Sequence, residues 1–179
     1  RNADDVKYDD YLNDKQLAGL KRYKGSSKTS DENYVWDAFD ERFDWTVEPN
    51  EVNRFGWVVE IDPFDPESKP KKLTALGRFK HENAAITLAP DNRVVVYMGD
   101  DQRSEYIYKF VSEGKFDPSN DAANRKLLHE GTLYVAVFSD NKATDGEFMG
   151  TGKWVPLVLD TPTVDGRRLG DIFADMGEL

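Results

Sequence analysis

Residues 54–66 read RFGWVVEIDPFDP, and residues 77–111 read GRFKHENAAITLAPDNRVVVYMGDDQRSEYIYKFV. These stretches decide the fold, because they hold short runs of β-branched and aromatic residues separated by turn-forming Pro, Asp, Asn and Gly. The pattern predicts strands over 55–62, 73–79, 84–88, 94–98 and 106–111, with a hairpin turn at 89–93. Further strands are predicted over 132–138 and 153–157.

Only short helical segments accompany these strands. The sequence predicts one helix over 15–24, capped by Asn13 or Asp14 and ended by Gly25, and another over 125–129. The fold class is therefore all-β with short helical excursions in the loops, either a sandwich or a β-propeller. We favour the propeller, because 84–111 resembles the first three strands of a blade. We expect residues 1–179 to form one partial propeller domain, in which 1–35 is a polar N-terminal segment.

The composition limits the partners. The net charge is -10 at pH 7 with 34 acidic against 24 basic residues, so nucleic acid and anionic membranes are not expected as general partners. The excess of acids either keeps the protein soluble or surrounds a bound cation, which would invert the local potential. There are no cysteines, so disulfides and thiolate metal sites are absent from this chain. No apolar run approaches the roughly 20 residues of a membrane span.

The densest group of charges lies at 99–105, between two predicted strands. Arg103 and Glu105 are two residues apart, so on a strand their side chains would share a face. A guanidinium binds two phosphate oxygens at once, and a carboxylate suits a hard cation. The alternative is a surface ion pair at a turn, which contributes little. Asp100 and Asp101 either bind Ca²⁺ or shape the turn.

A second charged group, Lys80, His81 and Glu82, precedes the strand at 84–88. In a propeller blade these residues and 100–105 would line the same channel mouth. Glu82 is a candidate metal ligand, His81 either a ligand or a packed structural histidine, and Lys80 a candidate phosphate contact. Glu60 and Asp62 would share one face of their strand, which lies either at the site or in solvent.

Several of these runs form a family likeness. The runs are DERFD (40–44), NRFGWVVEIDP (53–63), GRFKHE (77–82), YMGDD (97–101), EYIYKF (105–110), GTLYVA (131–136) and GKWVPL (152–157). Over roughly residues 35–160 the chain resembles the middle of the PhoX-type alkaline phosphatases.

The resemblance implies a fold and a chemistry. It implies a six-bladed propeller with a channel-bound cluster of Fe³⁺ and Ca²⁺ that hydrolyses phosphomonoesters. It makes Arg103 a phosphate contact and Glu105 a metal ligand, and it implies periplasmic or extracellular localisation. A cysteine with paired glutamates is expected upstream, and further acidic ligands and the remaining blades of the same propeller are expected outside this segment.

The predicted function is therefore phosphomonoester hydrolysis, with Arg103 as the catalytic residue of this segment and the isolated segment inactive. Two alternatives stay open: a calcium-dependent propeller lactonase or esterase, which would not need Arg103, and a non-catalytic propeller that serves in binding. A Ser-His-Asp hydrolase, a P-loop and an EF-hand find no support in the sequence.

Overall fold

The computed structural model describes residues 36–43, 47–48, 51–139 and 151–171. They fall into two units. One unit contains residues up to Phe55 together with those from Pro162 onward, and the other contains Gly56–Thr161. The candidate site residues all lie in the second unit.

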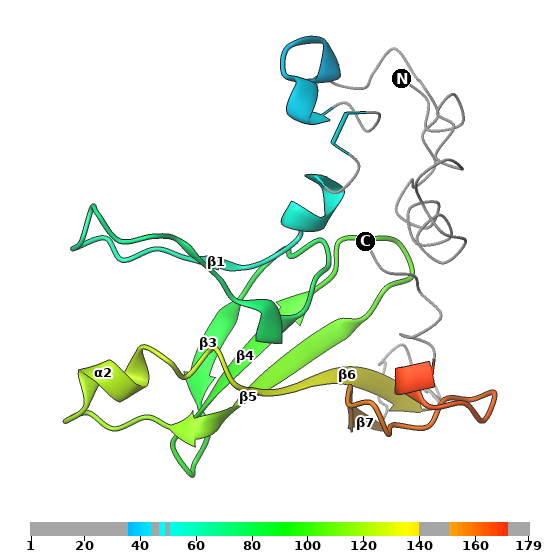
Figure 1. Cartoon of the computed structure of the whole chain (residues 1–179). Helices are drawn as coiled ribbons and strands as arrows, with labels where there is room; N and C mark the ends of the chain where they lie inside the picture. Colours follow the sequence, from blue (N-terminus) through cyan, green and yellow to red (C-terminus); the bar gives the residue numbers. More distant parts are fainter. Residues whose placement is uncertain (1–35, 44–46, 49–50, 140–150, 172–179) are drawn as a thin grey trace, which may run out of the picture. The chain divides into compact units, whose positions relative to one another are not determined.

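A five-stranded antiparallel sheet dominates the second unit (Figure 1). Its strands are β3 (Ala85–Leu88), β4 (Arg93–Gly99), β5 (Ile107–Lys115), β6 (Gly131–Ser139) and β7 (Thr151–Pro156), in the order β3-β4-β5-β6-β7. Each strand therefore pairs with its neighbour in the chain. The strands predicted at 84–88, 94–98, 106–111, 132–138 and 153–157 are confirmed, and so is the all-β class.

The turn between β3 and β4 is the predicted hairpin. Asn92 has a positive φ of 66°, a conformation that asparagine tolerates better than most residues. The Asp91 carboxylate accepts hydrogen bonds from the backbone N–H of Arg93 at 3.3 Å and from its Nε at 2.8 Å. Asp91 thus fixes the turn locally, which explains the register of β3 on β4.

Two predicted strands differ from the structure. The strand at 55–62 is reduced to β1 (Val59–Glu60), which pairs with β2 (Lys71–Lys72). The strand at 73–79 is wrong, because a 3₁₀ helix, η6 (Thr74–Leu76), occupies it. Leu73 and Leu76 are three residues apart, so they lie on one side of such a turn, and both are buried.

The helix predicted at 125–129 is also misplaced. The short helix α2 spans Asp121–Asn124, and residues 125–129 form turns. Asn120 sets its start, because its side chain accepts a hydrogen bond from the N–H of Ala123 at 3.1 Å. The regions 15–24 and 1–35 lie outside the described residues, and no helix among those described is long and apolar enough to cross a membrane.

The main core cluster lies on one face of the sheet, while Val95 and Ala136 are buried on the other face. Val94, Val96 and Met98 alternate along β4 and are buried, and Phe110 of β5 is fully buried beside Val96. Leu73, Leu76 and Leu127 cover this face. The core therefore joins the central strands to η6 and to the turns after α2, and it fixes the end of β4 where the charged loop begins.

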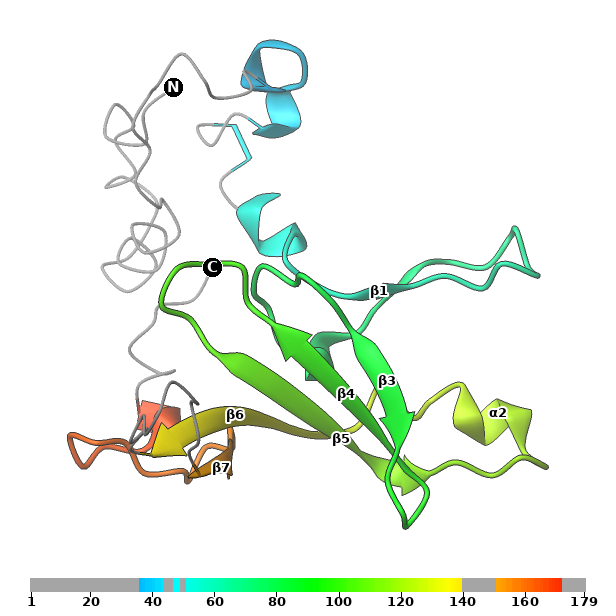
Figure 2. The same ribbon diagram turned by 180° about the vertical axis from the view of Figure 1, so that it is seen from behind.

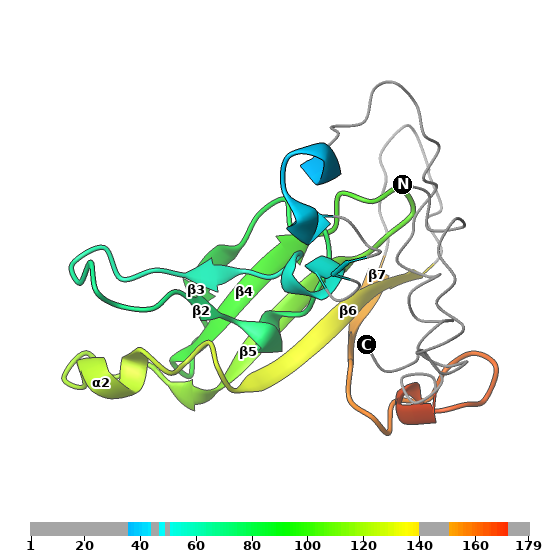
Figure 3. The same cartoon turned by 45° about the horizontal axis from the view of Figure 1, so that its top comes forward.

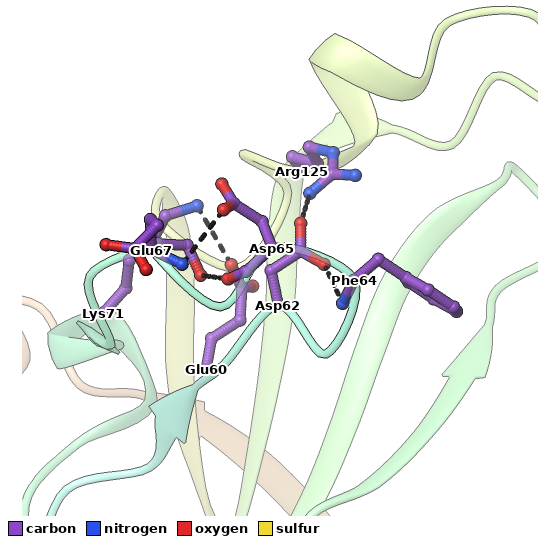
Figure 4. A network of polar contacts seen from close by, with 8 residues as sticks. Glu60, Asp62, Phe64, Asp65, Glu67, Lys71 and Arg125 are labelled. Atoms are coloured by element: carbon purple, nitrogen blue, oxygen red, sulfur yellow. Dashed lines mark hydrogen bonds and ion pairs between the residues drawn. The ribbon is translucent and has the colours of Figure 1, made fainter.

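The hairpin of β1 and β2 and the helix α2 project from the same end of the sheet (Figures 1, 2 and 3). Arg125 and Asp62 form an ion pair between these two projections (Figure 4). Glu60 pairs with Lys71 across the hairpin at 3.1 Å. The ion pair of Asp62 and Arg125 joins the two projections within the second unit, and that of Glu60 and Lys71 joins the two strands of the hairpin.

The described residues of the first unit include the 3₁₀ turns η3 (Trp36–Ala38), η4 (Glu41–Phe43) and η5 (Glu51–Arg54). Glu51 is 3% exposed. Its carboxylate lies 3.2 Å from Nε of Arg42 and 2.9 Å from a guanidinium nitrogen of Arg54. This buried carboxylate links η4 to η5, since a buried charge is tolerated only where it is paired.

Candidate functional site

The two charged groups predicted from the sequence lie side by side. Asp101 donates its N–H to the Lys80 carbonyl at 3.0 Å, and Glu82 donates to the Gly99 carbonyl at 3.2 Å. His81 and Asp100 form an antiparallel bridge. The cause is the ladder of β3 on β4: residues before Ala85 lie opposite residues after Tyr97. The predicted approach of 80–82 to 100–105 is confirmed, and we call the combined feature the charged rim.

Gln102 organises the loop between β4 and β5. Its N–H donates to Oδ1 of Asp100 at 3.0 Å, and its side-chain amide donates to Oε1 of Glu105 at 3.4 Å. Glu105 in turn donates its N–H to the Gln102 carbonyl at 3.2 Å. One glutamine thus ties two of the candidate carboxylates to the same turn, a role that the sequence alone did not suggest.

Arg103 and Glu105 do not lie on a strand. The strand β5 begins at Ile107, and Ser104 between them has a positive φ of 66°. The prediction that they share a face because of strand alternation is therefore wrong, since left-handed backbone at Ser104 breaks the alternation. They also form no ion pair in the described part of the chain, so the simple alternative of a surface ion pair is not observed.

The cationic side chains of the charged rim are exposed. Arg103 and Lys80 both reach solvent, and neither side chain has a hydrogen-bond or ion-pair partner among residues 36–43, 47–48, 51–139 and 151–171. Asp101, Glu82 and Glu105 are exposed as well, while Asp100 is half-buried. An anion approaching the rim would therefore meet two cations whose donors are not already used.

His81 lies at the inner side of the charged rim. Its ring stacks on Phe79 with centroids 3.7 Å apart, and its Nε2 lies 3.2 Å from the Gly77 carbonyl. Because a carbonyl can only accept, we assign the proton to Nε2, which leaves the buried Nδ1 as an acceptor without a partner in the described part of the chain. Burial lowers the pKa of His81, against the opposing effects of the Gly77 carbonyl and Asp100. A neutral imidazole with a free lone pair suits a ligand or an acceptor.

Tyr108 completes the stack behind His81. Its ring lies 4.4 Å from that of Phe79. Burial, followed by the negative charges of Glu105 and Asp100, raises the pKa of Tyr108 to about 12. The phenol therefore stays protonated and lies in the field of the rim carboxylates. Tyr108 lies opposite Met98 in the pairing of β4 with β5. Nothing in the sequence linked Tyr108 to the rim.

Glu60 and Asp62 form their ion pairs with residues outside the charged rim. Asp62 is hydrogen-bonded to Arg125 and to the N–H of Phe64, and both interactions lower its pKa. Glu60 pairs with Lys71 (Figure 4). Their contacts are structural, because they tie the hairpin together and to the segment after α2.

The donor set of the charged rim suits a hard cation, since Asp100, Asp101, Glu82 and Glu105 offer carboxylate oxygens. In the part of the chain that the structure describes, no group of three or more His, Asp or Glu side chains is arranged to hold a metal ion. The rim can therefore supply individual ligands, and a complete site needs further ones.

Comparison with known proteins places the chain in a family. The model of the family described as "Alkaline phosphatase PhoX" matches residues 9–177. The chain belongs to the PhoX family. A solved structure of PhoX from Pseudomonas fluorescens, in complex with vanadate, a transition state analogue, is 57% identical, with a TM-score of 0.68. The match covers 78% of this chain and 24% of that PhoX chain. No curated protein matches the chain.

The membership confirms the resemblance seen in the sequence. The mostly antiparallel β structure of the chain agrees with the propeller-type fold of PhoX, and the family implies metal cofactors. The chain spans about a quarter of the length of the PhoX structure that it matches.

Proposed function

We propose that this chain is part of a PhoX-type alkaline phosphatase, a phosphomonoester hydrolase, and that the charged rim contributes to its active site. The observation that carries the proposal is the pairing of the 80–82 and 100–105 segments by backbone hydrogen bonds, in a chain 57% identical to a PhoX that binds vanadate. Vanadate in that protein is a transition state analogue, as expected for an enzyme that transfers a phosphoryl group.

Arg103 and Lys80 are the proposed substrate contacts. Both are exposed and have no side-chain partner among the described residues. A guanidinium can donate two parallel hydrogen bonds to phosphoryl oxygens, and an ammonium adds a point charge. Cations held where charge develops stabilise the transition state more than the ground state. Arg103 is therefore the residue of this chain that we assign to catalysis.

Glu105 and Asp100 are the proposed first contributors to a metal cluster, with Asp101, Glu82 and His81 as further candidates. Ca²⁺ and Fe³⁺ are the proposed ions, because carboxylate oxygens suit both and the family resemblance implies them. Such a cluster supplies Lewis acidity toward the phosphoryl oxygens when bound. Gln102 holds Asp100 and Glu105 in place through its backbone and side-chain amides.

The wider setting is also part of the proposal. The remaining ligands and the other blades of a six-bladed propeller would come from sequence outside these 179 residues, and the enzyme would act in the periplasm or outside the cell. A lactonase or a binding module would not need the two unpartnered cations of the rim, so the phosphatase is favoured over both.

The test replaces Glu105 by glutamine in the full-length protein. Glutamine keeps the volume and the contact with Gln102 but removes the anionic oxygen, so bound metal and hydrolysis of p-nitrophenyl phosphate should fall together while the circular dichroism spectrum is kept. Glu113→Gln is the matched control, because Glu113 is exposed on β5 away from the rim. Full iron, calcium and activity in the Glu105→Gln protein would remove Glu105 from the metal site.

A further inference from the structure

Tyr108 lies where the core meets the charged rim. It pairs with Met98 across β4 and β5, and it packs against the core cluster. Asp100 follows Met98 by two residues and forms a bridge with His81, so both side chains continue the row on the core side of the sheet. Tyr108, Asp100 and His81 therefore project from the same face, at the end of the sheet where the charged loop begins.

Packing fixes the orientation of the Tyr108 ring. It stacks on Phe79 with centroids 4.4 Å apart and an interplanar angle of 24°, and Phe79 stacks in turn on His81. The Phe79 N–H donates to the Gly56 carbonyl at 3.0 Å, which holds the middle ring of the stack. A group that is fixed before binding loses little conformational entropy when it contacts a ligand. The Tyr108 phenol is therefore preorganised for such a contact.

The Tyr108 hydroxyl is an unused hydrogen-bond donor. It has no hydrogen-bond partner among the described residues, and it is not one of their fully buried side-chain atoms. Burial, followed by the charges of Glu105 and Asp100, raises the pKa of Tyr108, so the hydroxyl keeps its proton. It lies in the field of two carboxylates that we propose as metal ligands, which places the donor beside the proposed site.

We propose that the Tyr108 hydroxyl donates a hydrogen bond to a phosphoryl oxygen of the phosphomonoester, beside Arg103. Arg103 belongs to the same loop as Glu105, whose charge acts on Tyr108, so the three side chains surround one place. The inference rests on the proposed function and adds a neutral donor to its cations. Arg103 is exposed and must be ordered on binding, whereas the phenol is already held. A preorganised donor of this kind stabilises charge that develops in the transition state.

A metal ligand is the alternative role for Tyr108. The rim already offers the carboxylates of Asp100, Asp101, Glu82 and Glu105, which are the ligands that hard cations prefer. A phosphoryl oxygen needs a donor instead, and an ionised carboxylate has none to give. The chemistry of the rim therefore favours the substrate as the partner of the hydroxyl.

The first experiment replaces Tyr108 by phenylalanine in the full-length protein, with Tyr134→Phe as the matched control. Phenylalanine keeps the ring stack and removes only the hydroxyl. Tyr134 is also half-buried, and it pairs with Lys109, so it lies on the opposite face of the sheet. Tyr108→Phe should lower kcat/KM for p-nitrophenyl phosphate about tenfold or more with Tm and metal content unchanged, whereas Tyr134→Phe should stay within about twofold of wild type. Equal kcat/KM in the two variants would overturn the proposal. Loss of metal in Tyr108→Phe would overturn it too, because Tyr108 would then be a metal ligand.

The second experiment measures vanadate binding by isothermal titration calorimetry, which does not depend on turnover. Vanadate is a transition state analogue in the similar PhoX. Its Kd should rise about tenfold or more in Tyr108→Phe and stay within about twofold of wild type in Tyr134→Phe. An unchanged Kd in Tyr108→Phe would overturn the proposal, since a merely structural role leaves vanadate binding intact once Tm and metal content are kept.

Arg103→Ala separates this inference from the proposed function. If Arg103→Ala loses hydrolysis of p-nitrophenyl phosphate while Tyr108→Phe keeps it, only the role of Tyr108 is wrong. If Arg103→Ala keeps full activity, the charged rim is not the active site, and the role of Tyr108 is overturned with it.

Discussion

Arg103 presents an exposed guanidinium at the charged rim, with no side-chain partner among the described residues. In the full-length protein, we expect Arg103→Ala to lower kcat/KM by about 10²-fold or more, the usual cost of losing a charge-stabilising donor. The kcat/KM of Arg103→Lys should stay within about tenfold of that of Arg103→Ala, because lysine keeps the charge but cannot donate two parallel hydrogen bonds. Steady-state hydrolysis of p-nitrophenyl phosphate measures both.

Arg93 provides the control for this pair. It is bound to Asp91 at the turn that lies at the other end of β4 from the rim, so Arg93→Lys should leave kcat/KM unchanged. Near wild-type kcat/KM in Arg103→Lys would show that Arg103 only balances charge.

Gly131 allows a residue-scale test of packing. A Cβ on Gly131 would lie 2.3 Å from the Val111 carbonyl oxygen and 2.5 Å from the buried ring of Phe110. Gly131→Ala should therefore cost about 1–3 kcal/mol of unfolding free energy, the usual range for overpacking a core. Urea denaturation measures it. Gly99→Ala is the matched control, since a Cβ there meets nothing within 4 Å; equal midpoints would show that the sheet shifts freely at Gly131.

At the same scale, the sequence predicted which residues belong to the rim better than it predicted how they are oriented. Strand alternation predicted a common face for Arg103 and Glu105, but the left-handed conformation of Ser104 ends that alternation. Tyr108 and Gln102 were missed, because their links to Glu105 and Asp100 depend on burial and on a loop hydrogen bond. Neither is encoded in local spacing.

At the scale of elements, the ion pair of Asp62 and Arg125 connects the β1–β2 hairpin to the segment after α2. Arg125 lowers the pKa of Asp62 in the folded protein below its usual 3.8. The contribution to stability is therefore fully present above about pH 4 and is lost as the pH falls through the folded pKa. We expect Arg125→Gln to raise the pKa of Asp62 toward 3.8, as followed by NMR titration of its carboxyl carbon.

The pair of Arg93 and Asp91 supplies the reciprocal control for that titration. Arg93→Gln should raise the pKa of Asp91, which Arg93 lowers, and leave that of Asp62 unchanged. If Arg125→Gln leaves the Asp62 titration unchanged, the two projections are not joined in solution.

The elements themselves were predictable where hydrophobic runs were bounded by turn residues. The Val-rich run of β4 and the Asp91–Asn92 turn gave correct strands. The segment 73–79 has a strand-like composition, yet η6 forms there because Leu73 and Leu76 both reach the core from one side of a 3₁₀ turn. Tertiary burial thus overrode local propensity. The Asn120 cap sets the start of α2 at Asp121, whereas the predicted helix began four residues later, at 125.

At the scale of the whole molecule, the sequence predicted the approach of 80–82 to 100–105, because antiparallel pairing of β3 and β4 is sufficient to bring them together. The family was also recognisable from long ordered runs, and the match over residues 9–177 confirms it. A complete metal site could not be predicted from these residues, because no three candidate ligands converge among those described.

Because no complete ligand set is present among the described residues, we expect the 179-residue chain alone to have no metal-dependent phosphatase activity. It spans 24% of the PhoX structure that it matches, and closed propellers need roughly four to eight blades. Its rim offers candidate carboxylates without a three-ligand group in the described residues, so Ca²⁺ and Fe³⁺ should bind weakly and fail to remain bound during desalting. The measurement is p-nitrophenyl phosphate hydrolysis by the purified chain, with elemental analysis, beside the full-length protein. Turnover that depends on metal and disappears in Arg103→Ala would show instead that these residues carry a complete active site.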